Sequence, residues 1–434
     1  MKPQFDTIVI GAGLAGIAAA ERLSRAGQRI ALIEARERLG GRVYTKRDPL
    51  VDLPLEMGPE WFGESGPLHR VMASAGLDTP KGNGSFLRRT DGELSELDNP
   101  GEAWKELHQR LAMHRGADRS LESALLEYAD TPGLQEAAGQ LRGYVSGFHA
   151  ADPSDLSLAW LRQVERNQSA GESELRTRVG LDQGIDVLLR RLTSSCTAFP
   201  STIVRSVRWQ RGHVAAECAS GAQAGTITAR CAIVTLPLSV LQLPAGTPGA
   251  VQFTPALTAK RAPLSHLAMG PAVKLNMIFD AAFWRDLPRL GDALFIQDLS
   301  QPLPTWWTSR PVETPVLIGW AAGTQVQKVG SVEPEALQRT AIQSLAGVFA
   351  VSPALVARRL RAWYWHDWQA DPFAHGAYSW VRTGGVDAHT ALARPMQRTL
   401  FFAGEATCGK GYNATMDGAL ESGYRAADEV MAMG

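Results

Sequence analysis

The chain has 434 residues, of which 45% are hydrophobic and 20% are charged, so it can fill the cores of two or three domains. Its 44 basic and 44 acidic residues cancel, and no lysine or arginine cluster indicates a nucleic acid or a membrane surface as partner. The four cysteines have no metal-ligand spacing and are too few for a disulfide framework. Because no apolar stretch has the length of a bilayer span, and few residues precede the first predicted strand, we expect a soluble cytoplasmic protein without a metal site or a secretory signal.

A glycine-rich turn near the start of the chain joins a predicted strand to a predicted helix. The apolar run 7–10 leads into Gly11-Ala12-Gly13-Leu14-Ala15-Gly16, and residues 17–27 have a helical pattern. In a G-x-G-x-x-G turn Gly11 permits the sharp bend, Gly13 lets backbone N–H groups reach a pyrophosphate, and Gly16 lets helix and strand pack closely. This context favours a dinucleotide-binding turn over an ordinary glycine-rich connection.

A carboxylate ends the next predicted strand. Residues 30–33 are apolar, and Glu34 follows them, about 20 residues beyond the glycines, where a carboxylate binds a ribose 2′-hydroxyl. Such a carboxylate would repel a 2′-phosphate, so NADP is disfavoured. The following Gly40-Gly41 pair and Arg42 are either a solvated turn or a second contact to the anionic oxygens of a cofactor.

The remaining chain alternates between helical and strand patterns. Residues 68–180 are predicted to be mainly helical, strands dominate from 202 to 320, and a helix is predicted over 334–348. The chain closes with a strand at 400–403, the pair Gly404-Glu405 and a helix that begins near Thr415.

These patterns predict an α/β protein in which both ends of the chain belong to one Rossmann-like domain. The predicted limits of the discontinuous nucleotide-binding domain are 1–75, 181–255 and 385–434. An inserted α+β substrate-binding domain is predicted over 76–180 and 256–384.

Several stretches together resemble the flavin-containing amine oxidases, a family that includes monoamine oxidase, polyamine oxidase and the lysine-specific histone demethylases. The stretches follow the family order over nearly the whole chain. They are the GAGLAG turn with Glu34, the Gly40-Gly41-Arg42 turn, Lys274 in a strand leading to Phe279, the run from Trp368 to Ser379, and Phe402–Glu405 with Met416–Ala419.

The resemblance implies that the Rossmann-like domain binds FAD. We find only one nucleotide-binding turn, whereas a flavin enzyme reduced by NAD(P)H would normally need two, so an organic substrate should reduce the flavin itself. Ala377 stands where the monoamine oxidases have the cysteine bonded to the flavin, so we expect noncovalent FAD. The cofactor-binding residues implied are Gly11, Gly13, Gly16, Glu34, Arg36, Gly41, Arg42, Gly58, Val204, Trp368, Gly404, Glu405, Thr415 and Met416.

Lys274 is the first of three residues predicted to carry the chemistry. It lies inside the apolar run 273–279, where burial would disfavour its charged form. Spacing alone would place it on the wet face of an edge strand. The family's equivalent lysine holds a water against flavin N5, and the resemblance therefore assigns this role to Lys274.

Tyr378 and Thr415 are the other two. Tyr378 matches the family's aromatic-cage tyrosine, which flanks the path of the amine, although such a tyrosine is also an ordinary core residue. Thr415 occupies the position of the second cage tyrosine of the monoamine oxidases, and a half-open cage should admit longer or secondary amines. The last helix would direct its N–H groups at the flavin edge that becomes negative on reduction.

Other aromatic and histidine residues are less informative. Trp306, Trp307 and Trp320 either line the substrate cavity or belong to the core. His149 and His375 offer no catalytic pairing.

The favoured function is FAD-dependent oxidation of an amine C–N bond to an imine, with O2 as acceptor and H2O2 as product. The alternatives are an amine dehydrogenase with a protein acceptor, an L-amino-acid oxidase, and a redox-silent FAD scaffold. The expected partners are a small-molecule amine and O2, and the chain is a monomer or a homodimer. The sequence has no basic tail, so we do not expect a histone substrate.

Overall fold

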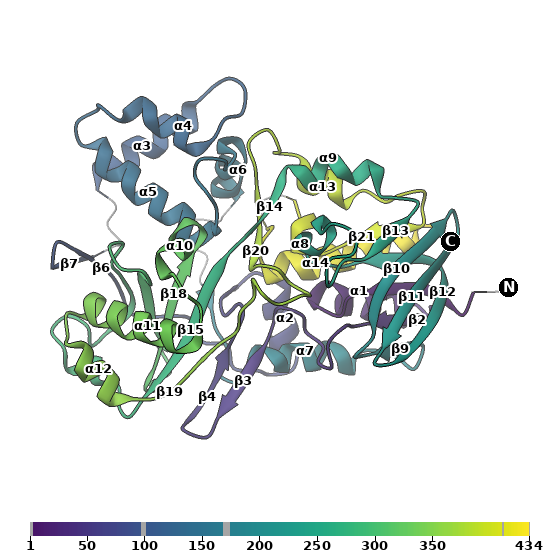
Figure 1. Cartoon of the computed structure of the whole chain (residues 1–434), viewed down its shortest axis with the longest axis horizontal. Coiled ribbons are helices and arrows are strands. Elements are labelled where there is room, and N and C mark those ends of the chain that lie inside the picture. The colour runs from purple at the N-terminus through teal and green to yellow at the C-terminus, as the bar shows by residue number, and fades with distance from the viewer. Residues whose placement is uncertain (1–2, 97–100, 168–173, 410–411, 434) are drawn as a thin grey trace.

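The structure, a computed structural model, describes residues 3–96, 101–167, 174–409 and 412–433. It has two lobes, each built around its own sheet (Figure 1). The two ends of the chain lie in the same lobe, as the predicted α/β architecture requires.

The sheet of the first lobe is mixed, with the order β13-β10-β11-β12-β1-β2-β9 and with β21 paired to β12. Its central strands β1 and β2 are parallel and apolar because helices and the rest of the lobe cover both faces. The strands are β1 Phe5–Ile10, β2 Ile30–Ile33, β9 Cys196–Phe199, β10 Ile203–Gln210, β11 His213–Ser220, β12 Gln223–Val234, β13 Gln252–Thr254 and β21 Leu400–Phe402.

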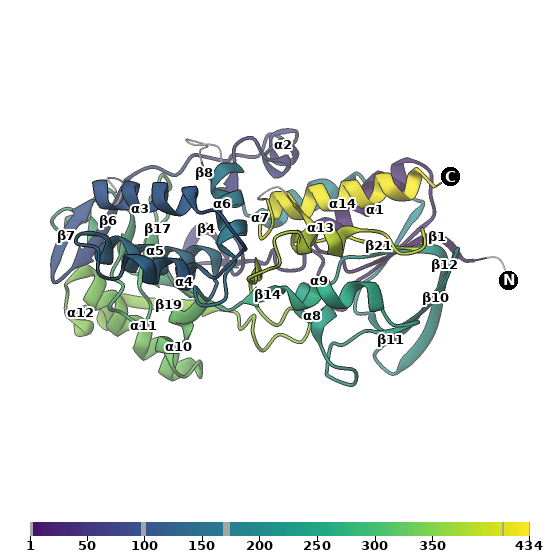
Figure 2. The same cartoon turned by 90° about the horizontal axis from the view of Figure 1, so that it is seen from above.

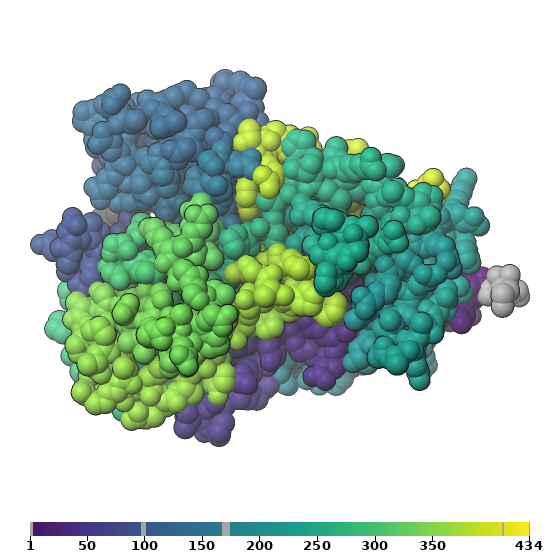
Figure 3. All heavy atoms as spheres, in the orientation of Figure 1, coloured from purple at the N-terminus to yellow at the C-terminus, as the bar shows by residue number. Residues whose placement is uncertain are grey.

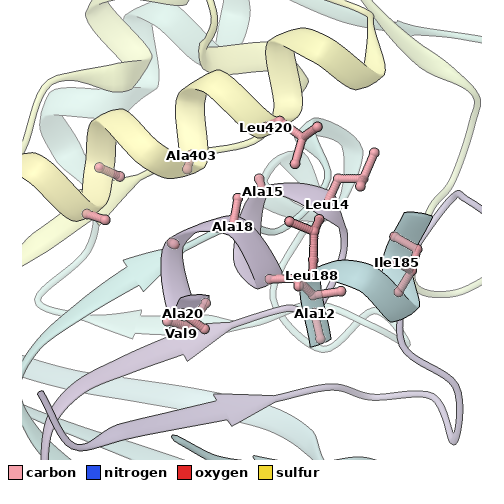
Figure 4. Packing of buried hydrophobic residues seen from close by; sticks show 14 of the residues in the cluster. Val9, Ala12, Leu14, Ala15, Ala18, Ala20, Ile185, Leu188, Ala403 and Leu420 are labelled. Carbon is pink, nitrogen blue, oxygen red and sulfur yellow. The ribbon is translucent and has the colours of Figure 1, made fainter. Parts of the chain in front are cut away.

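Helices α1 (Leu14–Arg25) and α14 (Met416–Met431) lie side by side on this sheet (Figures 2 and 4). Their backbones can approach closely because Gly423 of α14 has no side chain. A Cβ there would lie only 2.2 Å from the carbonyl oxygen of Ala15. The other helices of this lobe are α2 Pro67–Ala73, α7 Leu181–Arg190, α8 Leu238–Gln242, α9 Arg261–Ser265 and α13 Ala388–Ala393. The last helix of the chain therefore packs onto the first, although nearly the whole sequence separates them.

The sheet of the second lobe has the order β19-β15-β18-β17-β16-β6-β7. Its strands are β6 Ser85–Thr90, β7 Glu93–Glu96, β15 Ala272–Phe279, β16 Ala293–Gln297, β17 Thr305–Thr308, β18 Val316–Ala322 and β19 Leu360–Trp365. Its helices are α3 Glu102–Met113, α4 Leu121–Leu125, α5 Leu134–His149, α6 Leu158–Asn167, α10 Val326–Val329, α11 Pro334–Phe349 and α12 Pro353–Arg359. The predicted helix over 334–348 is confirmed.

Small strand pairs complete the molecule, and one of them holds a residue predicted for the site. They are β3 Thr45–Asp48 with β4 Val51–Glu56, β5 Phe62–Gly63 with β8 Glu174–Leu175, and β14 Leu267–Gly270 with β20 Tyr378–Val381. The chain near residues 370–380 lies at the junction of the lobes (Figure 3).

Residues 68–180 are mainly helical, as predicted, but the hairpin β6–β7 and the short strand β8 were not foreseen. The hairpin β6–β7 extends the second sheet there and ends it. As an edge hairpin it carries the charged sequences SFLRRT and ELSE, whose polar faces meet water, so no apolar run marked it. The proposed domain limits stay a prediction.

In the described part of the chain, no single helix has both the length and the apolar character needed to cross a membrane. The bent pair α11–α12, whose axes turn by 118°, meets the criterion only when its two helices are counted together.

Candidate active site

The two glycine turns predicted to hold phosphates meet backbone to backbone. Gly11 has φ +103°, and a Cβ on Gly16 would lie only 1.9 Å from the Gly11 carbonyl oxygen. Gly41 has φ +63°, and a Cβ there would lie 3.0 Å from Cα of Gly13. The surface that results has no side chains at these positions, which suits a ligand bound by backbone N–H groups, such as a pyrophosphate. The residues present therefore fit a dinucleotide.

Glu34, which is predicted to bind a ribose hydroxyl, lies beside the first glycine turn. The buried carboxylate of Glu34 accepts from the N–H groups of Ala12 and Arg36, both at 2.9 Å. The Glu34 carbonyl accepts from Thr202 at 2.8 Å, two residues before the buried Val204. Val204 therefore lies near Glu34 and Arg36, although about 170 residues separate it from them in the sequence.

A chain of contacts runs from this group toward Trp368. Arg36 pairs with Asp371 at 2.5 Å, and His366 bonds the other Asp371 oxygen at 2.8 Å. Burial alone would raise the pKa of Asp371, but His366 and Arg36 outweigh burial and hold that pKa well below its usual range. The His366 ring lies 4.2 Å from the Trp368 ring, and the Trp368 indole donates to the Met57 carbonyl at 2.8 Å. Trp368 is thereby fixed next to Gly58.

Arg42 and Glu405, predicted as neighbours of the cofactor, form an ion pair at 3.0 Å in which Glu405 is buried and Arg42 is half-buried. Arg42 also donates to the Ala377 carbonyl at 2.6 Å. The other Glu405 oxygen accepts from the Ser379 hydroxyl at 2.6 Å and from the Ala414 N–H at 3.2 Å. This pair ties together four distant segments around the start of α14.

Gly404 and Thr415 shape the backbone on either side of that pair. Gly404 has φ +124°, which a side chain would strain, and its N–H donates to Ser422 at 2.9 Å. Thr415 is the N-cap of α14, because its hydroxyl accepts from the Gly418 N–H at 2.9 Å. The helix begins at the buried Met416, as predicted. The Thr415 hydroxyl thus already serves the helix.

Lys274 is buried inside the second sheet. It lies in β15, between β18 and β19, and every residue of that strand is buried. Its Nζ donates to the Gly58 carbonyl at 3.0 Å and pairs with Glu60 at 2.8 Å. The alternative of a lysine on the wet face of an edge strand is therefore wrong. Lys274 thus contacts the carbonyl of Gly58, and Trp368 lies against the same residue.

Two further charged residues belong to this group and were not predicted from the sequence, Glu60 and Arg176. Arg176 pairs with the second Glu60 oxygen at 2.5 Å and donates to the Thr308 carbonyl at 3.1 Å. Burial would raise the pKa of Glu60, but Lys274 and Arg176 outweigh it and lower that pKa. The sequence signal for Glu60 was a glutamate beside Trp61 in a stretch that also holds Glu56, and nothing local pointed to Arg176.

Tyr378 forms one side of an aromatic group close to Lys274. Its hydroxyl donates to the Phe148 carbonyl at 2.7 Å, and burial raises its pKa, so the phenol stays neutral. Its ring packs in the cluster that contains Trp320, whose ring centre lies 6.3 Å from that of Trp307. The Lys274 Nζ lies 5.7 Å from the centre of the Trp307 ring. The two catalytic candidates thus border one aromatic wall.

The tryptophans and histidines separate into different roles. Trp307 and Trp320 belong to this wall, whereas Trp306 points the other way and is fully buried in the core of the second lobe. His149 is buried, burial lowers its pKa to about 4, and its Nε2 has no partner within the described residues. His375 Nε2 likewise has none there. In the ranges that the structure covers, no cluster of three or more histidine, cysteine or acidic residues could hold a metal ion.

The chain resembles known proteins along its whole length. The family model of flavin containing amine oxidoreductases matches residues 14–431. Lysine-specific histone demethylase 1 homolog 2 of Arabidopsis thaliana is 28% identical over 98% of the chain, and lysine-specific histone demethylase 2 of Homo sapiens is 25% identical over 98%. The chain spans 58% and 53% of these two relatives.

Solved structures share the fold at lower identity. A putrescine oxidase bound to putrescine superposes with a TM-score of 0.80 at 20% identity, covering 100% of both chains. Cyclohexylamine oxidase from Brevibacterium oxydans gives 0.82 at 20% identity, covering 99% of both. The chain therefore belongs to the flavin-containing amine oxidoreductases, which confirms the predicted family, its α/β fold and its flavin cofactor.

Proposed function

We propose that the protein oxidises the C–N bond of a small amine to an imine with FAD as cofactor and O2 as acceptor. Two electrons and two protons leave the amine and reduce O2 to H2O2, and water then hydrolyses the imine to an aldehyde or ketone. The observation that carries the proposal is Lys274, a buried ammonium that donates to Gly58. Its Nζ lies 5.7 Å from the centre of the Trp307 ring, which belongs to the aromatic wall that continues through Trp320 to Tyr378.

Each part of the site has a task in this reaction. FAD supplies a ring that takes an electron pair from the amine. The turns around Gly13 and Gly41 would hold its pyrophosphate, and Glu34 would hold a ribose hydroxyl. Tyr378 and Trp320 would orient the amine and exclude water from it. Lys274, as in the family resemblance, would hold the water that serves the return of electrons to O2.

The start of α14 adds fixed electrostatics. The helix has 16 residues, and its first N–H groups carry partial positive charge next to Glu405, Arg42 and Ala414. Such groups favour negative charge that develops nearby. No strong protein base is needed to oxidise a neutral amine, which agrees with His149, whose Nε2 has no hydrogen-bond partner among the residues that the structure describes.

An L-amino-acid oxidase is a weaker candidate. A substrate carboxylate needs a free cation, and the buried arginine near Lys274, Arg176, is already paired with Glu60. An amine dehydrogenase differs only in its electron acceptor. The cytoplasmic location expected from the free cysteines stays a prediction.

The test is anaerobic mixing of the yellow protein with a panel of monoamines, polyamines and aromatic amines while flavin absorbance is followed. Bleaching by an amine supports the proposal, and bleaching by none supports a redox-silent scaffold. Oxygen consumption with H2O2 release then separates an oxidase from a dehydrogenase. Acid precipitation should leave a colourless pellet, because Ala377 has no side chain that could bond the flavin.

A further inference from the structure

Glu60 is the centre of a buried cluster of three charges. One of its oxygens binds Arg176 at 2.5 Å, and the other binds Lys274 at 2.8 Å and accepts from Trp307 at 3.2 Å. The exposed fractions of Glu60, Arg176 and Lys274 are only 6%, 3% and 4%. Water therefore screens these charges poorly, and each strongly affects its surroundings.

The cluster contains two cations and one anion, which leaves one net positive charge. The neighbouring carboxyl of Glu56 adds none at neutral pH, because burial raises its pKa to about 8. Glu60 itself stays ionised between its two cationic partners. The cluster thus presents a defined positive charge beside the glycine, Gly58, that the family resemblance places at the cofactor.

The geometry also restricts Lys274. An ammonium has three N–H donors on a flexible stem. The Gly58 carbonyl and Glu60 take two of them, at 3.0 and 2.8 Å. The direction of the third donor is then determined, whereas without Glu60 the stem could swing.

We propose that Glu60 is a positioning residue that fixes the Lys274 ammonium and, with Arg176, holds the cluster at one net positive charge toward the bound flavin. This inference rests on the proposed function, which assigns Lys274 to the flavin site. A positive charge near the flavin favours its reduced, negatively charged form and so raises its reduction potential. A purely structural anchor would affect stability without any such ordered effect.

The first test measures the reduction potential of the bound FAD in a redox titration with a chemical reductant, followed by flavin absorbance. This measurement needs no amine. Removing the negative charge in Glu60→Gln should move the potential to more positive values. Removing a positive charge in Arg176→Met or Lys274→Met should move it to more negative values. Glu56→Gln is the matched control: its carboxyl is already neutral, so its potential should equal that of the parent.

The second test measures reoxidation of the reduced protein by O2 in a double-mutant cycle. Glu60→Gln should slow reoxidation by about 10-fold in the parent and have no further effect in Lys274→Met, because Glu60 acts through that ammonium. Glu60→Asp keeps the charge and shortens the side chain, so it should keep the parent potential and recover part of the lost rate.

An unchanged or lowered potential in Glu60→Gln, or rate effects of Glu60→Gln and Lys274→Met that multiply, would overturn the inference. If Glu60→Gln fails to fold, Arg176→Met and Lys274→Met decide: both must lower the potential. If no amine bleaches the flavin but the potentials follow the predicted order, the proposed function fails and the charge assignment stands.

Discussion

The glycine cradle of the first lobe and the charge cluster of the second are built in opposite ways. In the cradle, Gly11, Gly13 and Gly16 are neighbours in sequence, and backbone atoms form the surface. In the cluster, Glu60, Arg176 and Lys274 are more than 90 residues apart from one another, and side chains do the work. A surface made of backbone tolerates no side chain, whereas a surface made of side chains depends on charge. The two regions should therefore respond differently to substitution.

The largest effect is expected at Gly16. A Cβ in Gly16→Ala would lie 1.9 Å from the Gly11 carbonyl oxygen, and backbone on both sides leaves little room to relax. We expect loss of yellow, folded protein, measured by the ratio of flavin to protein absorbance after purification. The control is Gly139→Ala in α5, where nothing lies within 4 Å of the added Cβ. A yellow, stable Gly16→Ala would contradict the backbone-built cradle.

Next comes Lys274→Met. The substitution removes the buried ammonium but leaves Glu60 paired with Arg176, so the protein should still fold and bind FAD. Flavin reoxidation or imine turnover should slow by about 10-fold or more, equivalent to about 1.4 kcal/mol. Stopped-flow traces that match the parent would remove Lys274 from the mechanism.

Glu56 is a buried carboxyl that is neutral at neutral pH, whereas the buried Glu60 is ionised within an ion pair. Burial raises its pKa from 4.5 to about 8, so its contribution to stability is complete below pH 4.5 and is lost as the pH rises through 8. Glu56→Gln does not titrate. Between pH 5 and 8 the free energy of unfolding should therefore fall less in this variant than in the parent, by at least about 1 kcal/mol. Chemical denaturation at the two pH values measures the difference, and equal falls would show that Glu56 is ionised in the folded protein.

Tyr378→Phe should have the smallest effect. It keeps the ring in the aromatic wall and loses only the hydrogen bond to the Phe148 carbonyl, 2.7 Å long. We expect a loss of about 1 kcal/mol in unfolding free energy, with amine oxidation changed by less than about threefold. Tyr378→Ala, which also removes the ring, is the comparison. If Tyr378→Phe were as damaging to oxidation as Tyr378→Ala, the hydroxyl rather than the ring would be the functional group.

Local sequence determined the parts of this protein that depend on neighbouring residues. The turn with Gly11 and Gly16, the carboxylate of Glu34 at the end of β2 and the helix that starts at Met416 each follow from a short pattern, because a turn, a strand end and a helix cap are set within a few residues.

Tertiary structure decided which distant side chains meet. Glu60, in a loop just before β5, and Arg176, just after β8, belong to no recognisable motif. The pairing of strands β5 and β8 brings them together, and the fold places both at Lys274. The hairpin β6–β7 stayed hidden because an edge strand needs no apolar run. A charge can be buried only where a partner of opposite sign is held against it, and that partner is chosen by the fold rather than by its neighbours in the chain.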